Sequence, residues 1–292
     1  MSLESKLIVK KLSGTLYVVA TPIGNLGDIS KRAIETLASV DGIAAEDTRH
    51  SGRLLQHLGV STPMISLHEH NEGQRVVALL ERVENGEKVA LISDAGTPLV
   101  ADPGHRLVAL ARDKGLTVEP IPGPCAVIAA LSASGLSCDR FAFEGFLSAK
   151  KSSRRTRLSS LEKERRTLVF YESPYRLVEM MLDLKKVFGS YRNAVIAREL
   201  TKLYESWYRG SLEDLCEQIS SENLKGEMVV VVDGAPEIVA DDAPLADLLT
   251  ILLDEVPLKQ AASIAARISG ESRNRLYQLA LSLQSDNGDR TV

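Results

Sequence analysis

The sequence predicts an α/β fold: two α/β domains with a cleft between them, followed by a small helical domain of helix-turn-helix type. Short apolar runs alternate with helical stretches from Gly14 onward, as is typical of a parallel α/β sheet. A densely basic tract interrupts this alternation after Asp139, and the alternation then resumes. Beyond Ala235 the strand pattern stops and helical spacing remains. At 292 residues the chain is long enough for two compact domains.

The first α/β domain is expected at residues 14–125, after an N-terminal extension at 1–13. Its apolar runs are short, whereas the stretches between them carry apolar residues at helical spacing. The predicted strands are 15–20, 42–46, 64–67, 88–93 and 117–121. The predicted helices are 30–40, 51–60, 72–86 and 104–114, with a small-residue helix within 122–135.

The second α/β domain is expected at residues 126–235. It opens with the aromatic run FAFEGF and the basic tract, and a second strand and helix series follows. The predicted strands are 167–172, 193–199 and 227–234, with a helix at 174–189. A linker rich in Pro, Asp and Ala is expected at 236–243.

The helical domain is expected at residues 244–292 and comprises three helices, with a break between the last two at Ser269 and Gly270. Two helices joined by a short Gly-containing turn resemble a helix-turn-helix. The local charge of the segment 258–281 is positive, because it contains a single acid, Glu271, and four cations, Lys259, Arg267, Arg273 and Arg275.

Composition excludes several classes of protein. Hydrophobic residues make up 44% of the chain and charged residues 25%, which is typical of globular proteins. The cysteines, Cys125, Cys138 and Cys216, are far apart and form no C-x-x-C pair, which argues against a disulfide framework and against a zinc site. No segment resembles a signal peptide or a membrane span, so we expect a cytoplasmic protein. The net charge of −4 disfavours a surface that is basic throughout, although local patches can still bind phosphate.

Three Gly- and Pro-rich segments follow predicted strands, and open α/β sheets bind ligands at the carboxyl ends of their strands. TPIGNLGD at 21–28 fits an ordinary turn as well as a ligand loop. SDAGTPLVADPG at 93–104 concentrates so many Gly, Pro and Asp residues that we interpret it as a ligand loop. The small residues after the prolines of PIPGPC could admit a cofactor or let two layers pack closely.

These three segments, in this order and followed by a second α/β domain, resemble the tetrapyrrole-methylase family, the class III methyltransferases. The later segments FYESPYR, ARELTKLYE and GEMVVVV resemble a branch that acts on ribosomal RNA. The resemblance covers residues 14–235 and implies S-adenosylmethionine in the cleft between two α/β domains, and a homodimer. The chain departs from the tetrapyrrole-modifying members in one motif: it has Gly96-Thr97-Pro98 where they have Gly-Asp-Pro, which argues against a corrinoid substrate.

The resemblance also implies which residues contact the cofactor. Both predicted domains contribute to this set. The implied contacts are Ile23, Gly96, Thr97, Val100, Cys125, Ala126, Tyr171, Ala197 and Met228.

The basic tract between residues 150 and 166 carries eight cations interrupted by two glutamates. Such density suits a polyphosphate partner, because each neutralised phosphate releases condensed counterions. The alternative is a solvated helix face. Since the tract lies at the predicted domain junction, we interpret it as an RNA-docking surface formed by Lys150, Lys151, Arg154, Arg155 and Arg157.

Candidate polar groups for catalysis follow other strand ends. A ribose hydroxyl is a poor nucleophile, so a base or a polarising group must assist its methylation. Lys202 could act as that base if burial lowered its pKa. The alternative is structural pairing of these charges across the domain interface. The predicted active-cleft residues are Asp47, Arg49, Glu172, Arg198 and Lys202.

The resemblance therefore implies 2'-O-methylation of a cytidine ribose in the decoding region of 16S rRNA, within the assembled small subunit. Two alternatives remain open at this point. One is methylation of a tetrapyrrole or another small molecule, which would need neither the basic tract nor the helical domain. The other is a nucleic-acid-binding ligand sensor without catalytic activity. No metal is required for any of them.

Overall fold

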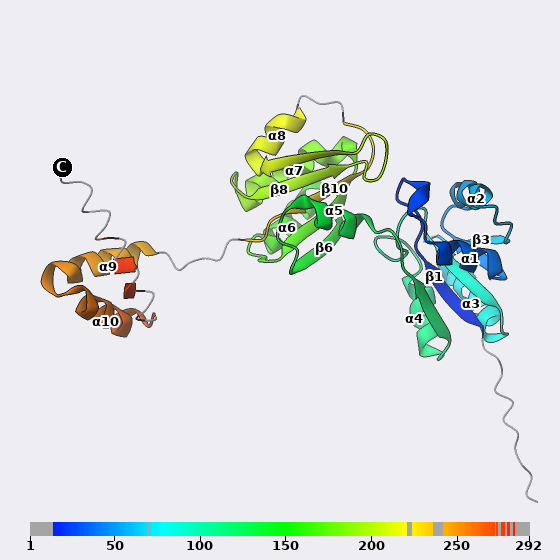
Figure 1. Ribbon diagram of the computed structural model, residues 1–292, viewed down its shortest axis with the longest axis horizontal. Coiled ribbons are helices and arrows are strands. Elements are labelled where there is room, and N and C mark those ends of the chain that lie inside the picture. Colours follow the sequence, from blue (N-terminus) through cyan, green and yellow to red (C-terminus); the bar gives the residue numbers. More distant parts are fainter. Residues whose placement is uncertain are drawn as a thin grey trace, which may run out of the picture. The chain divides into compact units, whose positions relative to one another are not determined.

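The fold was analysed in a computed structural model that describes residues 14–68, 71–220, 224–235 and 242–271, together with residues 273, 276, 277, 279, 280 and 283. The chain divides into two compact units, Met1–Ala235 and Pro236–Val292. Figure 1 shows two sheets with their helices in the first unit and helices alone in the second. The further division of the first unit at residue 125 stays a prediction.

The first sheet is parallel throughout and has the strand order β3-β2-β4-β1-β5. All five of its predicted strands are present. They are β1 (Thr15–Val19), β2 (Gly42–Ala45), β3 (Met64–Ser66), β4 (Lys88–Ile92) and β5 (Thr117–Ile121). The connecting helices are η1 (Leu26–Asp28), α1 (Lys31–Ser39), α2 (Thr48–His57), α3 (Glu72–Glu84) and α4 (His105–Asp113).

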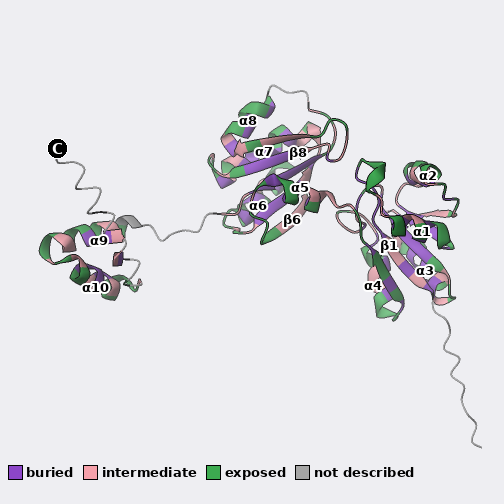
Figure 2. Ribbon diagram, in the orientation of Figure 1, coloured by how far each residue is buried: buried purple, intermediate pink, exposed green. Residues whose placement is uncertain are grey.

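Both faces of this sheet are buried, as parallel sheets require. Successive residues of β1 alternate between the two faces: Leu16 packs with the helices α3 and α4, whereas Val19 packs with α1 and α2. In β4, Leu91 and Ile92 divide between the faces in the same way. Figure 2 shows the strands buried and the outer helix faces exposed. The carboxyl ends of β1 and β4 therefore emerge side by side from a two-sided core.

The second sheet is mixed and has the order β6-β7-β10-β8-β9. Its strands β6 and β7 are parallel, and the other neighbours are antiparallel. The short connection between β8 and β9 explains part of this, because a few residues can join only antiparallel neighbours. The strands are β6 (Phe141–Phe146), β7 (Thr167–Glu172), β8 (Asn193–Arg198), β9 (Ser206–Ser211) and β10 (Met228–Val232). The helices are α5 (Ala126–Ser134), α6 (Lys151–Leu161), α7 (Pro174–Phe188) and α8 (Leu212–Ser220).

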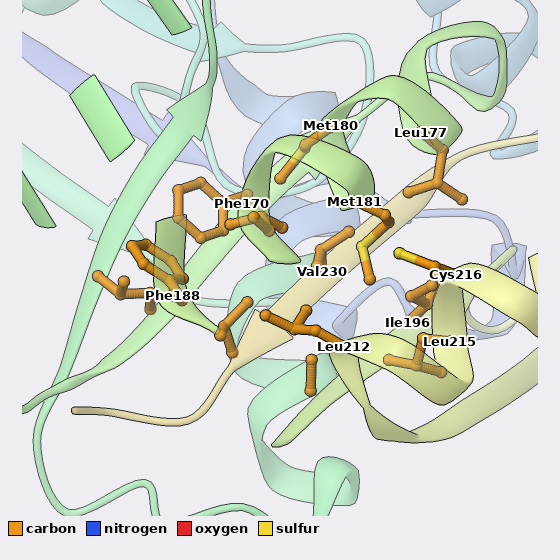
Figure 3. Packing of buried hydrophobic residues seen from close by; sticks show 14 of the residues in the cluster. Phe170, Leu177, Met180, Met181, Phe188, Ile196, Leu212, Leu215, Cys216 and Val230 are labelled. Carbon is orange, nitrogen blue, oxygen red and sulfur yellow. The ribbon is translucent and has the colours of Figure 1, made fainter. Parts of the chain in front are cut away.

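One face of the second sheet packs against α7 and α8 (Figure 3). Phe170 of β7 and Val230 of β10 meet Met180 and Met181 of α7 there. The opposite face carries a separate apolar cluster that includes Val169 and the helix α5. Ile23, which follows the first strand of the first sheet, belongs to this cluster. The turn after β1 therefore packs with the second sheet.

The C-terminal unit is helical. Its described helices are α9 (Asp242–Glu255) and α10 (Leu258–Ser269), which pack on each other around Leu249 and Ala262. The predicted break is present, because α10 ends at Ser269 and Gly270 takes the left-handed conformation that terminates helices (φ 77°). Most of the third predicted helix, the linker core and the extension at 1–13 lie outside the described residues.

A buried ion pair joins α6 to α7. The Arg154 side chain is 1% exposed and its Nε donates to Asp183 Oδ2 at 2.8 Å. The carboxylate of Asp183 is 2% exposed and also accepts from Arg155 at 2.6 Å. A charge in such a position is tolerated only when it is paired.

We expect Arg154→Met to lower the free energy of unfolding by about 3 kcal/mol, because the change leaves a buried carboxylate with one cation fewer. Arg157→Met is the matched control. Arg157 pairs with Glu144 at 2.7 Å, but its own side chain is 54% exposed and that of Glu144 is 10% exposed, so its loss should cost less than the loss of Arg154. Urea unfolding, followed by circular dichroism, measures the free energy of unfolding of both variants. Equal losses for the two variants would contradict the structural role of Arg154.

Candidate functional site

A cavity of about 400 Å³ lies in the first unit, where loops from both sheets meet. This volume is in the range of small-molecule sites. Its walls are formed mainly by the loop that follows β4, the start of α5, the end of β7 and the start of β10. The lining residues are 94–97, 100–102, 125–126, 171–174 and 226–229, with Ile23, Phe146 and Leu200.

Backbone pairing holds the loops after β1 and β4 together. Thr21 N donates to Gly96 O at 2.8 Å, and Gly96 N donates to Thr21 O at 3.1 Å. The hydroxyl of Thr97 donates to Pro124 O at 2.9 Å, which ties the segment before α5 to the same loop. The three Gly- and Pro-rich segments singled out in the sequence therefore converge at one edge of the first sheet.

The loop between β4 and α4 is conformationally strained. Leu99 and Ala101 have φ values of 73° and 72°, although neither is a glycine. Each such residue costs of order 1–3 kcal/mol and persists only where the surrounding structure holds it. Gly96 has φ 83°, and a Cβ there would lie 3.2 Å from Ile23 Cγ2. The loop thus has a fixed conformation that a relaxed turn would not adopt.

An irregularity in β6 supplies part of the opposite wall. The register with β7 shifts between Phe143 and Gly145, and Gly145 has φ 64°. Bulges of this kind redirect the side chains that follow. Phe146 consequently lines the cavity with its ring 5.5 Å from that of Tyr171. Burial raises the pKa of Tyr171 well above its ordinary range, so its hydroxyl stays protonated.

The cavity is acidic. Four carboxylates line it, and the described lining residues include no Lys or Arg. Such a lining favours a ligand that carries positive charge. The four carboxylates are Asp94, Asp102, Glu172 and Glu227.

Asp102 is the carboxylate with the most perturbed acidity in this cavity. Burial raises its pKa from the ordinary 3.8 to about 6; the negative charge of Asp94 adds to the rise, and a hydrogen bond with Ser93 opposes it. Ionisable groups that combine burial with a charged neighbour in a cleft are typical of functional sites. Asp102 was not among the residues predicted for the site, although it lies in the loop that the sequence indicated.

Residues 15–216 match the family described as Tetrapyrrole (Corrin/Porphyrin) Methylases. The chain belongs to the tetrapyrrole methylase family. A second match, at residues 239–284, is to the family described as RsmI C-terminal HTH domain, in agreement with the predicted helix-turn-helix.

Within this family, similar proteins are named ribosomal RNA small subunit methyltransferase I. The protein of that name from Pseudomonas aeruginosa is 52% identical over 277 residues, covering 93% of this chain and 98% of its own. The one from Escherichia coli O157:H7 is 49% identical and covers 93% and 96%. The one from Synechocystis is 46% identical and covers 94% and 99%. The chain thus belongs to this branch of the methyltransferases.

Solved structures show the tetrapyrrole methylase fold. The methyltransferase CobJ superposes with a TM-score of 0.58 at 19% identity, covering 76% of this chain and 95% of its own. Uroporphyrin-III C-methyltransferase from Thermus thermophilus, complexed with S-adenosylhomocysteine, gives a TM-score of 0.54 at 18% identity and covers 75% and 97%. These likenesses concern the fold alone.

The structure brings most of the predicted cofactor contacts into the cavity. Ala197 is the exception: it is not among the lining residues and is fully buried in β8, where it packs in an apolar cluster. The contact role of the others stays a prediction. The residues that line the cavity are Ile23, Gly96, Thr97, Val100, Cys125, Ala126, Tyr171 and Met228.

Three predicted active-cleft residues have their charges already engaged, and one of them, Glu172, lines the cavity. The carboxylate of Glu172 accepts from Ser173 N at 2.8 Å and Arg176 Nη2 at 2.9 Å. Asp47 caps the N-terminus of α2, and the hydrogen bond from Arg49 lowers its pKa to about 2. The Arg49 side chain is exposed on that helix. Asp47 and Arg49 are outside the lining; Asp47 caps α2, and Arg49 forms an ion pair with it.

Arg198 and Lys202 hold the loop between β8 and β9. The guanidinium of Arg198 donates to Lys225 O at 2.7 Å. Lys202 pairs with Glu199 at 2.8 Å and Glu227 at 3.2 Å. Burial lowers the pKa of Lys202, but the two glutamates outweigh it and the pKa is raised. Lys202 is therefore protonated, and the lowered pKa that its suggested role as a base requires is not present.

The basic tract is partly neutralised by acids of the same unit, which pair with Arg154, Arg155, Arg157 and Arg166. Arg154 is buried, which corrects its assignment to the RNA-docking surface, and Arg155 shares the same aspartate. Arg157 is exposed but paired with Glu144. Lys150 and Lys151, at the start of α6, are exposed. A count of cations in the sequence overestimates the charge that this surface presents to a partner.

The raised pKa of Asp102 predicts a cost to stability. In the folded state the proton binds more tightly than in the unfolded chain, so the destabilisation is absent at low pH and grows as the pH rises through about 6. We expect Asp102→Asn to raise the free energy of unfolding by about 1–2 kcal/mol at pH 8, with a smaller gain at pH 4.5.

Urea unfolding at the two pH values measures this difference. Asp113→Asn, at the exposed end of α4, is the control and should change stability little at either pH. A loss of stability on Asp102→Asn at pH 8 would contradict the assignment of a raised pKa.

Proposed function

We propose that this protein transfers a methyl group from S-adenosylmethionine to the ribose 2'-hydroxyl of a cytidine in the decoding region of 16S rRNA, within the assembled small subunit. One observation carries the proposal: the chain is about half identical, over more than nine tenths of its length, to proteins named ribosomal RNA small subunit methyltransferase I. The match includes the C-terminal helical unit as well as the methylase fold.

The cavity suits S-adenosylmethionine in size and in charge. The cofactor has a sulfonium, an ammonium and one carboxylate, so it is a net cation, and the lining provides four carboxylates. Apolar walls formed by Ile23, Val100 and Met228 would hold its uncharged parts. The strained backbone of the loop after β4 would present its N–H and C=O groups to the ligand. The cofactor supplies an activated methyl group and requires no metal.

The chain's own contribution is to align the two reactants and exclude water. Methyl transfer is an in-line displacement, in which alignment accounts for much of the rate. The rigid pairing between Thr21 and Gly96 fixes one wall, and the rings of Phe146 and Tyr171 form an apolar opposite wall. The ribose hydroxyl also has to lose its proton, which calls for a nearby base.

Two observations on the described residues bear on the oligomeric state and on the cellular location that accompany the proposed function. Exposed apolar side chains of the first unit support a homodimer, as large exposed apolar groups mark interfaces. They include Phe146, Tyr175, Leu203 and Tyr204. Within the described residues, no helix is long and apolar enough to cross a membrane. If it acts on the small subunit as proposed, the protein would work in the cytoplasm.

The direct test is methyl transfer with labelled S-adenosylmethionine. We expect label to enter 16S rRNA of small subunits purified from cells that lack this modification, and to be found on a ribose of cytidine after digestion. Subunits that already carry the modification are the control and should accept no label. Label in a porphyrinoid and none in RNA would favour a tetrapyrrole substrate. Cofactor binding with no transfer to either would favour a ligand sensor.

We also expect the exposed lysines at the start of α6 to contribute to RNA docking. Lys150→Ala with Lys151→Ala should weaken binding to small subunits and reduce the slope of log K against log salt by about 1–2, since each phosphate contact contributes about one unit. Cofactor affinity should be unchanged. Lys31→Ala, on α1 and paired with Glu35, is the control. An unchanged slope in the double variant would show that the start of α6 is a solvated helix face that does not dock RNA.

A further inference from the structure

We propose that Asp102 is the general base that accepts the proton of the ribose 2'-hydroxyl. This inference rests on the proposed function and deepens it, because it names the group that activates the nucleophile. The geometry points to Asp102 through its place in the cavity wall, the strain of the backbone beside it, and the engagement of the other charged groups nearby.

The backbone around Asp102 is built to hold that side chain. Ala101, which precedes it directly, has a left-handed conformation, and so does Leu99. Gly104, with φ 113°, then starts α4. A strained conformation is unfavourable for folding, so its presence beside a cavity-lining carboxylate indicates a functional position.

The other carboxylates of the cavity are engaged. Glu172 is neutralised by Arg176 and also accepts from Ser173 N. Glu227 pairs with the protonated Lys202. Asp94 accepts from Asp47 N at 3.1 Å, which makes it a support for the neighbouring loop. Asp102 lines the cavity with a hydrogen bond to Ser93 but without an ion pair among the described residues.

Its surroundings also strengthen Asp102 as a proton acceptor. The titratable groups that line the cavity with it are Asp94, Cys125, Tyr171, Glu172 and Glu227. None of them is a cation, so none stabilises the ionised form. Burial and Asp94 raise the pKa of Asp102 to about 6, which leaves it ionised at neutral pH and more basic than an ordinary carboxylate.

The step balances without any additional reactant. The O–H proton of the ribose passes to a carboxylate oxygen of Asp102. The hydroxyl oxygen forms a bond to the methyl carbon as the sulfur–methyl bond breaks. The electron pair of the broken bond stays on sulfur. The products are the 2'-O-methyl ribose, S-adenosylhomocysteine and protonated Asp102, which returns its proton to water.

Single-turnover methylation of unmodified small subunits tests the proposal, because it reports the chemical step apart from product release. Each variant is assayed with S-adenosylmethionine at least tenfold above its own measured Kd. For the wild-type protein, we expect the rate to rise with pH to a plateau above about 6. Asp102→Asn should lower the plateau by about 10²–10⁴-fold and abolish the pH dependence.

Asp94→Asn tests whether the pH dependence of transfer reports the ionisation of Asp102. It removes the neighbouring charge that raises the pKa of Asp102, so the rising limb should move to lower pH while transfer persists. Asp113→Asn should behave as the wild type. Thermal unfolding of each variant confirms that it is folded.

Two results would overturn the proposal while leaving the proposed function intact. In one, Asp102→Asn transfers the methyl group at the wild-type rate. In the other, it weakens cofactor binding but regains the full rate at saturating cofactor, which would make Asp102 a cofactor ligand. Failure of the wild-type protein to methylate RNA would instead overturn both the proposed function and this inference.

Discussion

The pairing of Thr21 with Gly96 is the constraint on which the site depends. Two backbone hydrogen bonds join the loops that leave adjacent parallel strands, and they do so where both strands have just emerged from a core buried on two faces. Because β1 and β4 cannot shift without exposing one apolar face, the loops inherit a fixed position. The positive φ values at Leu99 and Ala101 are sustained by this anchoring.

Periodicity and turn chemistry were sufficient to predict most of the fold. The five strands of the first sheet, the position of the helices and the helix break at Gly270 follow from local patterns, and the structure confirms them. The mixed direction of the second sheet did not follow, since β9 is half-buried and rich in polar residues. Its place is decided by pairing with β8 rather than by its own sequence.

The candidate site was predictable where backbone shape matters and less so where charge matters. Glycines and prolines after a strand marked the loop, and most of the residues inferred from the family line the cavity. The sequence could not show which charges cancel. Lys202 is held by two glutamates, one of them distant in sequence, and Arg154 is buried against a helix that follows much later. Asp102 gains its basicity from burial, which no local pattern reports.

The acidic cavity has a consequence for the energetics of the proposed reaction. Before transfer, a positively charged sulfonium faces an ionised Asp102; afterwards the sulfur is a neutral thioether and the carboxyl group is neutral. One pair of opposite charges is thus annihilated beside a partly buried carboxylate, where separated charges are less well solvated than in water. Asp94 and the two paired glutamates would then line a site whose ligand has lost its net positive charge. Their attraction for the spent cofactor is therefore weaker, and the polarity of the wall itself would promote exchange for a fresh one.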